Sequence, residues 1–216
     1  MDISALTDIV AAVIYVVLAL VALWGLYCVV VVWTRVGQKR FRNEEAQIEF
    51  LTALEGPLEK GDFDGAGMLC EDDPRVVPQL TFLAIQNRKL GFAKIKQLVM
   101  DRFQRDVLAD LEHRLSWVNT VIKSAPMIGL LGTVIGMMGA FDKLATSENV
   151  KPDQLASNIS VALVTTASGL AIAIPLVMCM ASINVRIQKM EDLAMSGLTR
   201  VMGSYRTGLQ ARGMKV

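Results

Sequence analysis

Histidine and cysteine are scarce in this sequence of 216 residues, which has one histidine and three cysteines. The histidine, His113, has no second histidine or cysteine near it in the chain, so the three or four ligands of a zinc site are not expected. The cysteines form neither an even set nor a CxxC pair, which argues against a disulfide framework. A Walker loop and a GxSxG nucleophile motif are also absent. We therefore expect no metal, no cofactor and no catalytic residue.

Charge is missing from three long stretches, although 20% of all residues are charged. Residues 9–33, 125–141 and 159–185 contain no Asp, Glu, Lys, Arg or His. The chain is 53% hydrophobic, with a mean hydropathy of +0.42. A bilayer core of about 30 Å needs about 20 apolar residues of helix. These stretches predict an all-α membrane protein with three transmembrane helices. The first is not a cleavable signal peptide, because no basic residue precedes it.

The distribution of lysine and arginine predicts the orientation. None precedes the first span, whereas 20 of the 22 lie between spans one and two or after span three, leaving only Lys143 and Lys151 in the short loop. Basic residues stay on the cytoplasmic side, so the N-terminus is expected outside and the C-terminus inside. The expected domains are 1–34 with the first span, a cytoplasmic helical domain at 35–124, spans two and three with their periplasmic loop at 125–185, and a cytoplasmic tail at 186–216. The net charge of +1 gives no reason to expect nucleic-acid binding.

The segment between spans one and two has the pattern of helices. One helix is expected up to about Leu54, where Gly56-Pro57 breaks it. From Gln79 the apolar spacing predicts one long helix that runs into span two. The aspartates of "GDFDGAG" do not have EF-hand spacing, and we interpret them as a solvated turn.

Small residues line one face of each of the last two spans. They are Gly129, Gly132, Gly136 and Gly139 on span two, and Ala162, Thr166, Gly169 and Ala173 on span three. Small residues let helices in lipid approach closely, so these stripes predict a packing face. Thr133 and Thr166 interrupt the stripes with hydroxyls. Each is compatible with a bond to its own helix or with a narrow polar lining. The spans contain no Asp, Glu, Lys, Arg or His, so any intramembrane carboxylate must come from another chain.

Two stretches carry a resemblance to a known family. "APMIGLLGTVIGMMGAF" on span two and "ALVTTASGLAIAIP" on span three resemble the ExbB/TolQ/MotA family of bacterial proton-channel subunits, and the topology is closest to ExbB and TolQ. The resemblance implies a homopentameric ring in the inner membrane around single-span partners of the ExbD/TolR/MotB type, which supply an aspartate. A TonB/TolA-type protein is a further candidate partner. The resemblance also implies that Thr133 and Thr166 form the proton pathway and face the partner's aspartate.

One position departs from the family pattern. ExbB and TolQ typically have a glutamate near the outer end of span three, and this sequence has Val161 at that position. MotA-type subunits also lack the glutamate. The chain then uses only the partner carboxylate, belongs to a divergent branch, or is an engineered variant. The expected function is a proton-channel subunit that converts the proton motive force into mechanical work on a periplasmic or outer-membrane target. The alternatives are a passive membrane scaffold and a sodium-driven, MotA-like stator subunit.

Overall fold

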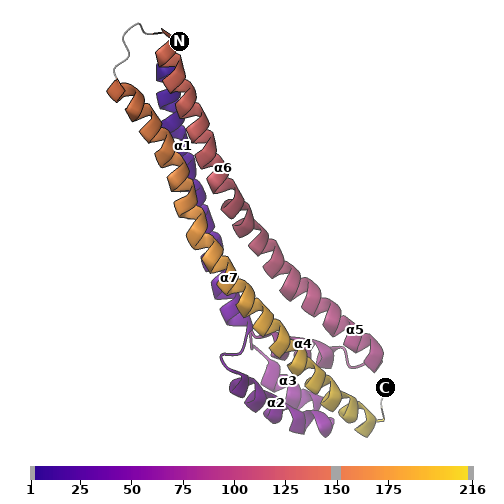
Figure 1. Ribbon diagram of the computed structural model, residues 1–216. Coiled ribbons are helices and arrows are strands. Elements are labelled where there is room, and N and C mark those ends of the chain that lie inside the picture. Colours follow the sequence, from indigo (N-terminus) through magenta and orange to yellow (C-terminus); the bar gives the residue numbers. More distant parts are fainter. Residues whose placement is uncertain (1–2, 147–151, 214–216) are drawn as a thin grey trace. The chain divides into compact units, whose positions relative to one another are not determined.

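The computed structural model describes residues 3–146 and 152–213, and these residues form helices joined by short turns (Figure 1). The elements are α1 (Ile3–Lys39), α2 (Glu44–Glu59), α3 (Phe63–Cys70), α4 (Val76–Gln86), α5 (Phe92–Arg102), the π-helical stretch η1 (Phe103–Leu108), α6 (Ala109–Thr146) and α7 (Pro152–Ala211). No strand occurs in the described ranges. The expected all-α class is confirmed.

The chain divides into two compact units. The first unit comprises residues 1–31 and 114–182, and the second comprises residues 32–113 and 183–216. Among the described residues, three helices are long and apolar enough to cross a membrane, within Ile9–Lys39, Phe92–Asp142 and Leu155–Ala211. Each expected span lies within one of these helices. The finer boundaries at 34, 124 and 185 remain predictions.

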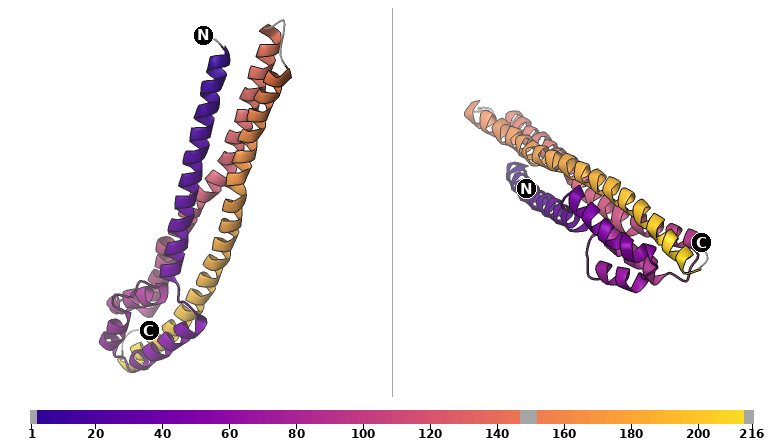
Figure 2. Two further views of the ribbon diagram at one scale, coloured as in Figure 1. Left: turned by 90° about the vertical axis from the view of Figure 1, so that its left-hand side faces the viewer. Right: turned by 90° about the horizontal axis from the view of Figure 1, so that it is seen from below.

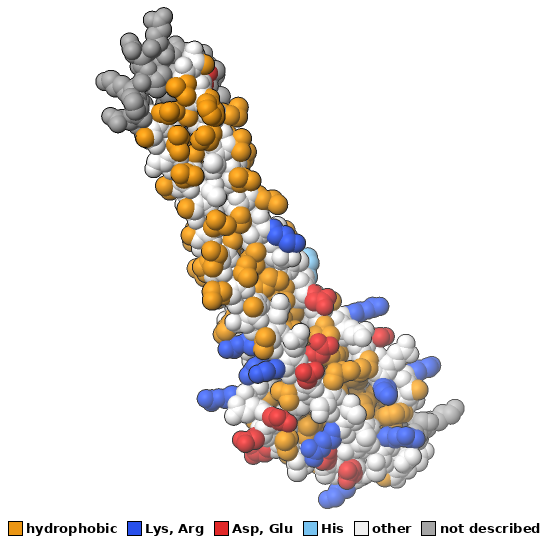
Figure 3. Space-filling view, viewed as in Figure 1, with side chains coloured by type: hydrophobic (Ala, Val, Ile, Leu, Met, Phe, Trp, Pro, Cys, Tyr) orange, Lys and Arg blue, Asp and Glu red, His pale blue; other side chains and the backbone are white. Residues whose placement is uncertain are grey.

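The first unit is a bundle of three helices, to which α1, α6 and α7 contribute. The helices α6 and α7 run side by side in two views (Figure 1, Figure 2). Large apolar side chains cover the outside of this unit, as Figure 3 shows for one face. Leu23 on α1, Met138 on α6 and Met178 on α7 are 65%, 65% and 69% exposed. Apolar side chains at this exposure require a nonaqueous surrounding, as lipid supplies.

Helix α1 also has a buried face, although residues 9–33 are apolar on every side. Ile14 and Leu18 are buried, and Gly25 is buried on the same side. A methyl group added to Gly25 would lie 2.8 Å from Cγ1 of Val121 and 2.9 Å from Cδ1 of Leu176. Gly25 therefore lets α1 approach α6 and α7 closely, a role that the large residues around it concealed.

The second unit has a conventional helical core. Its short helices pack in chain order, α2 on α3, α3 on α4 and α4 on α5. Tyr205 of α7 is fully buried and donates a hydrogen bond to the carbonyl oxygen of Ala84 at 3.1 Å. The side-chain amide of Gln47 donates to the carbonyl oxygen of Leu193 at 2.6 Å. These two bonds tie α2 and α4 to the end of α7, so the polar groups in this core have partners.

A charged pair closes the turn before α4. Arg75 pairs with Asp73 and lies over the ring of Phe41, with its Cζ 4.0 Å from the ring centroid. Burial by itself raises the pKa of Asp73, but the hydrogen bonds and charge of Arg75 outweigh it and lower the pKa. Asp62 accepts a hydrogen bond from the Gly65 amide at the start of α3, and Asp64 pairs with Arg88 at 2.8 Å. Both aspartates thus have structural contacts.

The expected helix break at Gly56-Pro57 is wrong, because α2 continues to Glu59. A proline costs a helix the hydrogen bond that its missing amide cannot make. Here the proline lies two residues before the last residue of the helix, and Leu58 beyond it is fully buried. The burial of Leu58 compensates for one lost bond. The turn instead falls at Gly61, whose φ of +72° is readily adopted by glycine.

The single helix expected from Gln79 into span two is also interrupted. Residues 87–91 separate α4 from α5, and Gly91 lies at the N-cap of α5. The side chain of Asn87 donates to the carbonyl oxygen of Leu83 at 2.8 Å, which satisfies a carbonyl at the end of α4. From Phe92 onward the helix continues through η1 into α6, as the apolar pattern indicated.

Candidate functional site

The candidate site lies where α6 meets α7 in the first unit. A methyl group added to Gly129 would lie 2.7 Å from the carbonyl oxygen of Thr165 and 3.0 Å from Cα of Thr166. At Gly136 it would lie 2.7 Å from Cβ of Ala162. These distances are shorter than van der Waals contact, so the two backbones approach as closely as glycine permits.

Two more glycines lie in this contact zone. The three atoms nearest to a methyl group added at Gly132 belong to the side chain of Thr165, with its Oγ1 at 2.5 Å. Gly169 of α7 faces the backbone of Ala125 and Pro126. The structure therefore brings three glycines of the α6 stripe against α7, and one glycine of the α7 stripe against α6. Gly139 and Ala173 are buried too.

Three threonine hydroxyls lie in the contact zone between α6 and α7, which we call the seam. Oγ1 of Thr133 and Oγ1 of Thr166 are hydrogen-bonded to each other. Thr166 also lies 3.1 Å from the carbonyl oxygen of Gly129, and Thr133 lies 3.1 Å from the carbonyl oxygen of Ala162. Thr133 additionally lies 3.4 Å from the Gly129 carbonyl oxygen of its own helix. The two sequence-predicted hydroxyls thus form one cluster from two helices.

The third hydroxyl belongs to Thr165, which is not among the residues that the sequence predicts for the site. Thr165 is 1% exposed, and its Oγ1 lies 2.6 Å from the carbonyl oxygen of Ala162 and 3.2 Å from that of Gly129. It therefore shares both carbonyl acceptors with Thr133. Its neighbour Thr166 is the one in the small-residue stripe, and adjacent helical positions are about 100° apart. The seam is wide enough to include both.

Exposure separates the three hydroxyls. Thr165 is enclosed between the helices, whereas Thr133 and Thr166 are only partly buried. The enclosed hydroxyl can bond only to backbone carbonyls, which stabilises the helix pair. The other two border a surface from which a group of another chain can reach them.

The position of the family glutamate, Val161, lies near α1. The Val161 side chain is 42% exposed, and its carbonyl oxygen accepts a hydrogen bond from the Tyr15 hydroxyl at 3.4 Å. Tyr15 is a polar group of the first span that sequence reasoning missed. The signal in the sequence was a phenolic hydroxyl within the uncharged run of residues 9–33, which Tyr27 also has.

No side chain of this cluster changes charge at physiological pH. Its members are hydroxyls and backbone carbonyls, and the described residues contain no group of three or more His, Cys, Asp or Glu that could hold a metal ion. A hydroxyl carries one donor hydrogen and two acceptor lone pairs. Each donor hydrogen here has an acceptor within the seam. The capacity that remains on Thr133 and Thr166 is therefore acceptor capacity, which suits an incoming group that donates a proton.

The fold and the site define a multi-span helical membrane protein in which two spans pack through small residues and share a hydroxyl cluster. A family model described as the MotA/TolQ/ExbB proton channel family matches residues 85–195. The chain belongs to this family. Membership confirms the resemblance inferred from the span motifs, and it confirms that the chain is a channel-family subunit and not an enzyme.

Individual relatives carry ExbB and TolQ names. The chain is 36% identical over 102 residues to the Tol-Pal system protein TolQ of Haemophilus influenzae, covering 47% of this chain and 43% of that protein. It is 28% identical over 157 residues to a putative biopolymer transport protein ExbB homolog of Methanothermobacter thermautotrophicus, covering 72% and 54%. To the biopolymer transport protein ExbB of Pseudomonas putida it is 32% identical over 145 residues, covering 65% and 42%. The chain spans about half the length of the curated relatives it matches. The similarity to ExbB and TolQ, together with the three apolar helices, places the chain among multi-pass inner-membrane proteins.

Proposed function

We propose that this chain forms the channel wall of a proton-driven motor of the ExbB–ExbD and TolQ–TolR type. The single observation that carries the proposal is the Thr133–Thr166 pair, which leaves hydroxyl lone pairs at a partly exposed seam without any titrating group nearby. A proton crossing here needs a carboxylate from elsewhere, and a single-span partner with an intramembrane aspartate supplies it. The hydroxyls accept a hydrogen bond from that carboxyl once it is protonated.

The energy for the motion comes from the membrane potential. One elementary charge moving through 100 mV releases about 2.3 kcal/mol. An ionised aspartate in the membrane has a high desolvation cost, which protonation removes. Protonation at one seam therefore frees the partner helix to change neighbours, and deprotonation fixes it again. In a pentamer of this chain around the partner, successive protons produce a stepwise movement that works on a periplasmic or outer-membrane target. A TonB/TolA-type protein is the candidate that receives it.

The test is reconstitution of the chain with its single-span partner in vesicles that contain a pH-sensitive dye. With an imposed potential, we expect proton flux only when both proteins are present. Replacing the partner's intramembrane aspartate by asparagine removes the only titrating group at the seam, so the flux is expected to fall to the level of empty vesicles. Mass measurement of the purified complex checks the pentamer.

Flux that persists with asparagine would contradict a carboxylate-dependent path. A complex that forms but carries no protons with either aspartate or asparagine in the partner would favour the passive scaffold. The valine at position 161, where the family has a glutamate, is the reason for testing that alternative. Flux that follows a sodium gradient instead of a proton gradient would identify the MotA-like alternative.

The orientation has its own test, for which the native cysteine at position 70 is unsuitable. Cys70 is 2% exposed, and burial, followed by the charge of Asp73, raises the pKa of its thiol to about 12. A thiol in that state reacts slowly from either side of the membrane. Gly56 is exposed with nothing within 4 Å of an added Cβ, so Gly56→Cys is the better cytoplasmic probe.

With an impermeant maleimide on intact cells, we expect labelling of Ser147→Cys and none of Gly56→Cys. After membrane permeabilisation, Gly56→Cys is expected to become reactive. Ser147 and Lys151 lie outside the described residues, so this prediction rests on the lysine and arginine distribution. Labelling of Gly56→Cys in intact cells would invert the proposed topology.

A further inference from the structure

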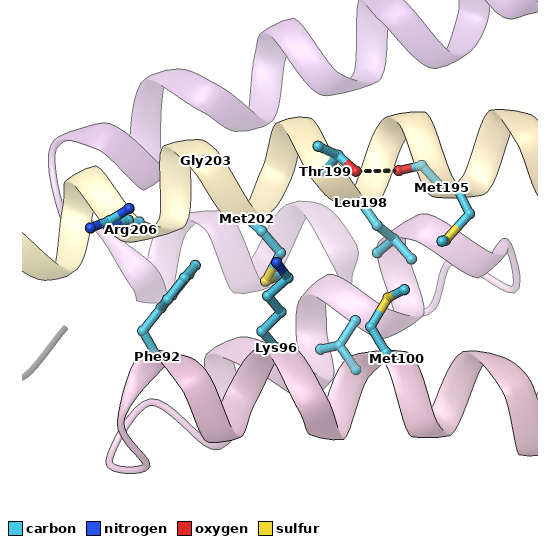
Figure 4. A pocket seen from close by; sticks show the side chains of 10 residues that line it. Phe92, Lys96, Met100, Met195, Leu198, Thr199, Met202, Gly203 and Arg206 are labelled. Atoms are coloured by element: carbon cyan, nitrogen blue, oxygen red, sulfur yellow. Dashed lines mark hydrogen bonds between the residues drawn. The ribbon is translucent and has the colours of Figure 1, made fainter.

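A groove in the second unit lies between α5 and α7 (Figure 4). It has a volume of about 380 Å³. Its walls are predominantly apolar, and three of its lining residues are methionines, Met100, Met195 and Met202. Methionine is flexible and polarizable, and methionine-rich grooves adapt to the apolar faces of bound helices. The lining is of the kind that receives an amphipathic peptide.

The floor and the rim of the groove differ in burial. Val99, Leu198 and Met202 form the floor and are 1%, 2% and 7% exposed. Met195 on the rim is 38% exposed. The floor therefore belongs to the core of the unit, while the rim offers apolar surface that the described residues leave uncovered.

The charges of the groove have one sign. Lys96 of α5 and Arg206 of α7 line it, and no acidic residue is among its ten lining residues. Arg206 lies near Phe92, with its Cζ 5.9 Å from the ring centroid. Arg200 belongs to the same stretch of α7 but is paired with Glu55 and does not line the groove. The occupant that fits by charge is acidic.

Gly203 leaves the backbone of α7 uncovered where this helix lines the groove. Glycine within a helix costs about 1 kcal/mol relative to alanine, so it usually has a packing reason. Gly197 and Gly208 of the same helix have one, since an added Cβ at either would collide with Gln47 or with the backbone of Leu58. At Gly203, which is exposed and lines the groove, nothing lies within 4 Å. A glycine here leaves room for a neighbour to approach the backbone.

We propose that this groove binds a short acidic amphipathic helix contributed by the cytoplasmic end of the single-span partner, an inference that rests on the proposed function. The helices that form the groove are α7 and the continuous α5–η1–α6 helix. Along the chain, the same two helices continue into the predicted spans that carry the threonine pair. Met202 follows Val185 by 17 residues of helix, about 26 Å. At that distance from the predicted end of the span, a bilayer lipid does not reach the groove.

The experiment uses Gly203→Cys in the full chain, coexpressed with the partner. Single cysteines are placed one at a time along the partner segment that precedes its span, and crosslinking with a short bis-maleimide is measured. The matched control is Gly56→Cys, an exposed helical glycine with equal room for the side chain but outside the groove. We expect crosslinks to Gly203→Cys at helical spacing along the segment, at least tenfold more than to Gly56→Cys.

Charge reversal tests the complementarity. Lys96→Glu with Arg206→Glu is expected to lower the crosslinking yield at least tenfold, and replacement of the partner segment's acidic residues by lysine is expected to restore it. Equal crosslinking of both cysteine variants, or a yield insensitive to charge, would overturn the proposal. Crosslinks only between two copies of this chain would overturn it in favour of a second copy as the occupant.

Failure of the groove is distinguishable from failure of the proposed function. If the partner copurifies and proton flux is normal but the groove does not crosslink, only the docking proposal is wrong. If the partner neither copurifies nor supports flux, both are wrong.

Discussion

Gly129→Leu is expected to prevent α6 and α7 from packing, so that little folded protein is recovered. An added Cβ already lies 2.7 Å from the carbonyl oxygen of Thr165 and 3.0 Å from Cα of Thr166, and these backbone atoms cannot move without displacing α7. Overpacking of a core typically costs about 1–3 kcal/mol, and a leucine against backbone lies at or above the upper end. The measurement is the fraction of detergent-solubilised chain that elutes as one monodisperse species. We expect this fraction to fall at least about tenfold, which corresponds to about 1.4 kcal/mol.

The matched control is Leu130→Ala, one position along α6, where the native side chain is 58% exposed. It is expected to leave the recovered fraction unchanged. A second comparison uses Gly132, where the three atoms nearest to an added methyl belong to the Thr165 side chain. Gly132→Ala is therefore expected to be relieved by Thr165→Gly, whereas Gly129→Leu is not. Normal recovery of Gly129→Leu would show that the helices do not approach as closely as described.

Replacing both hydroxyls of the pair, in Thr133→Val with Thr166→Val, is expected to stop proton flux while leaving complex formation intact. Valine keeps the shape of threonine and removes its donor and acceptors. A hydrogen bond between neutral groups, here a threonine hydroxyl and the protonated carboxyl, is worth about 0.5–1.5 kcal/mol, so each single variant is expected to lower the flux by up to about tenfold. Thr166→Val is expected to be the more damaging, because Thr165 is enclosed in the seam and cannot replace it. Flux is measured in vesicles, and partner copurification is checked separately.

Two further variants separate a proton path from simple packing. Thr→Ser at either position keeps the hydroxyl and is expected to retain most of the flux. Ser182→Ala removes an exposed hydroxyl that bonds to its own helix at Met178, 3.1 Å away, and is expected to have no effect. Full flux in the double valine variant would remove Thr133 and Thr166 from the proposed path. The seam would then be a packing surface alone.

Several features could be predicted from the sequence because they depend on local composition. A span is visible as an uncharged run, since the bilayer excludes charge over its full thickness. The glycine stripe is visible because helical periodicity places 129, 132 and 136 on one face. The absence of a carboxylate from the spans is also visible, because aspartate and glutamate are recognised by residue type alone.

Features that depend on packing between distant segments could not be predicted in this way. Helix α2 continues through Pro57 because Leu58 beyond it is buried. That burial depends on segments distant in the sequence, so the residues around Pro57 do not predict it. The rotation of α7 against α6 decides which of the adjacent Thr165 and Thr166 is enclosed between the helices. Gly25 was concealed among large apolar residues because lipid and a neighbouring helix favour the same side chains.

The sequence by itself determined the class of this protein: three uncharged helices, two small-residue stripes with hydroxyls, and no Asp, Glu, Lys, Arg or His in the spans. The tertiary structure alone decided which hydroxyls share an acceptor, that Thr133 bonds Thr166, and that Gly203 is left uncovered in a cationic, methionine-lined groove. The physical reason is that exclusion of charge from lipid acts on each residue separately. Hydrogen bonds and close contacts across a seam depend instead on the register and rotation of two helices, which many contacts set together.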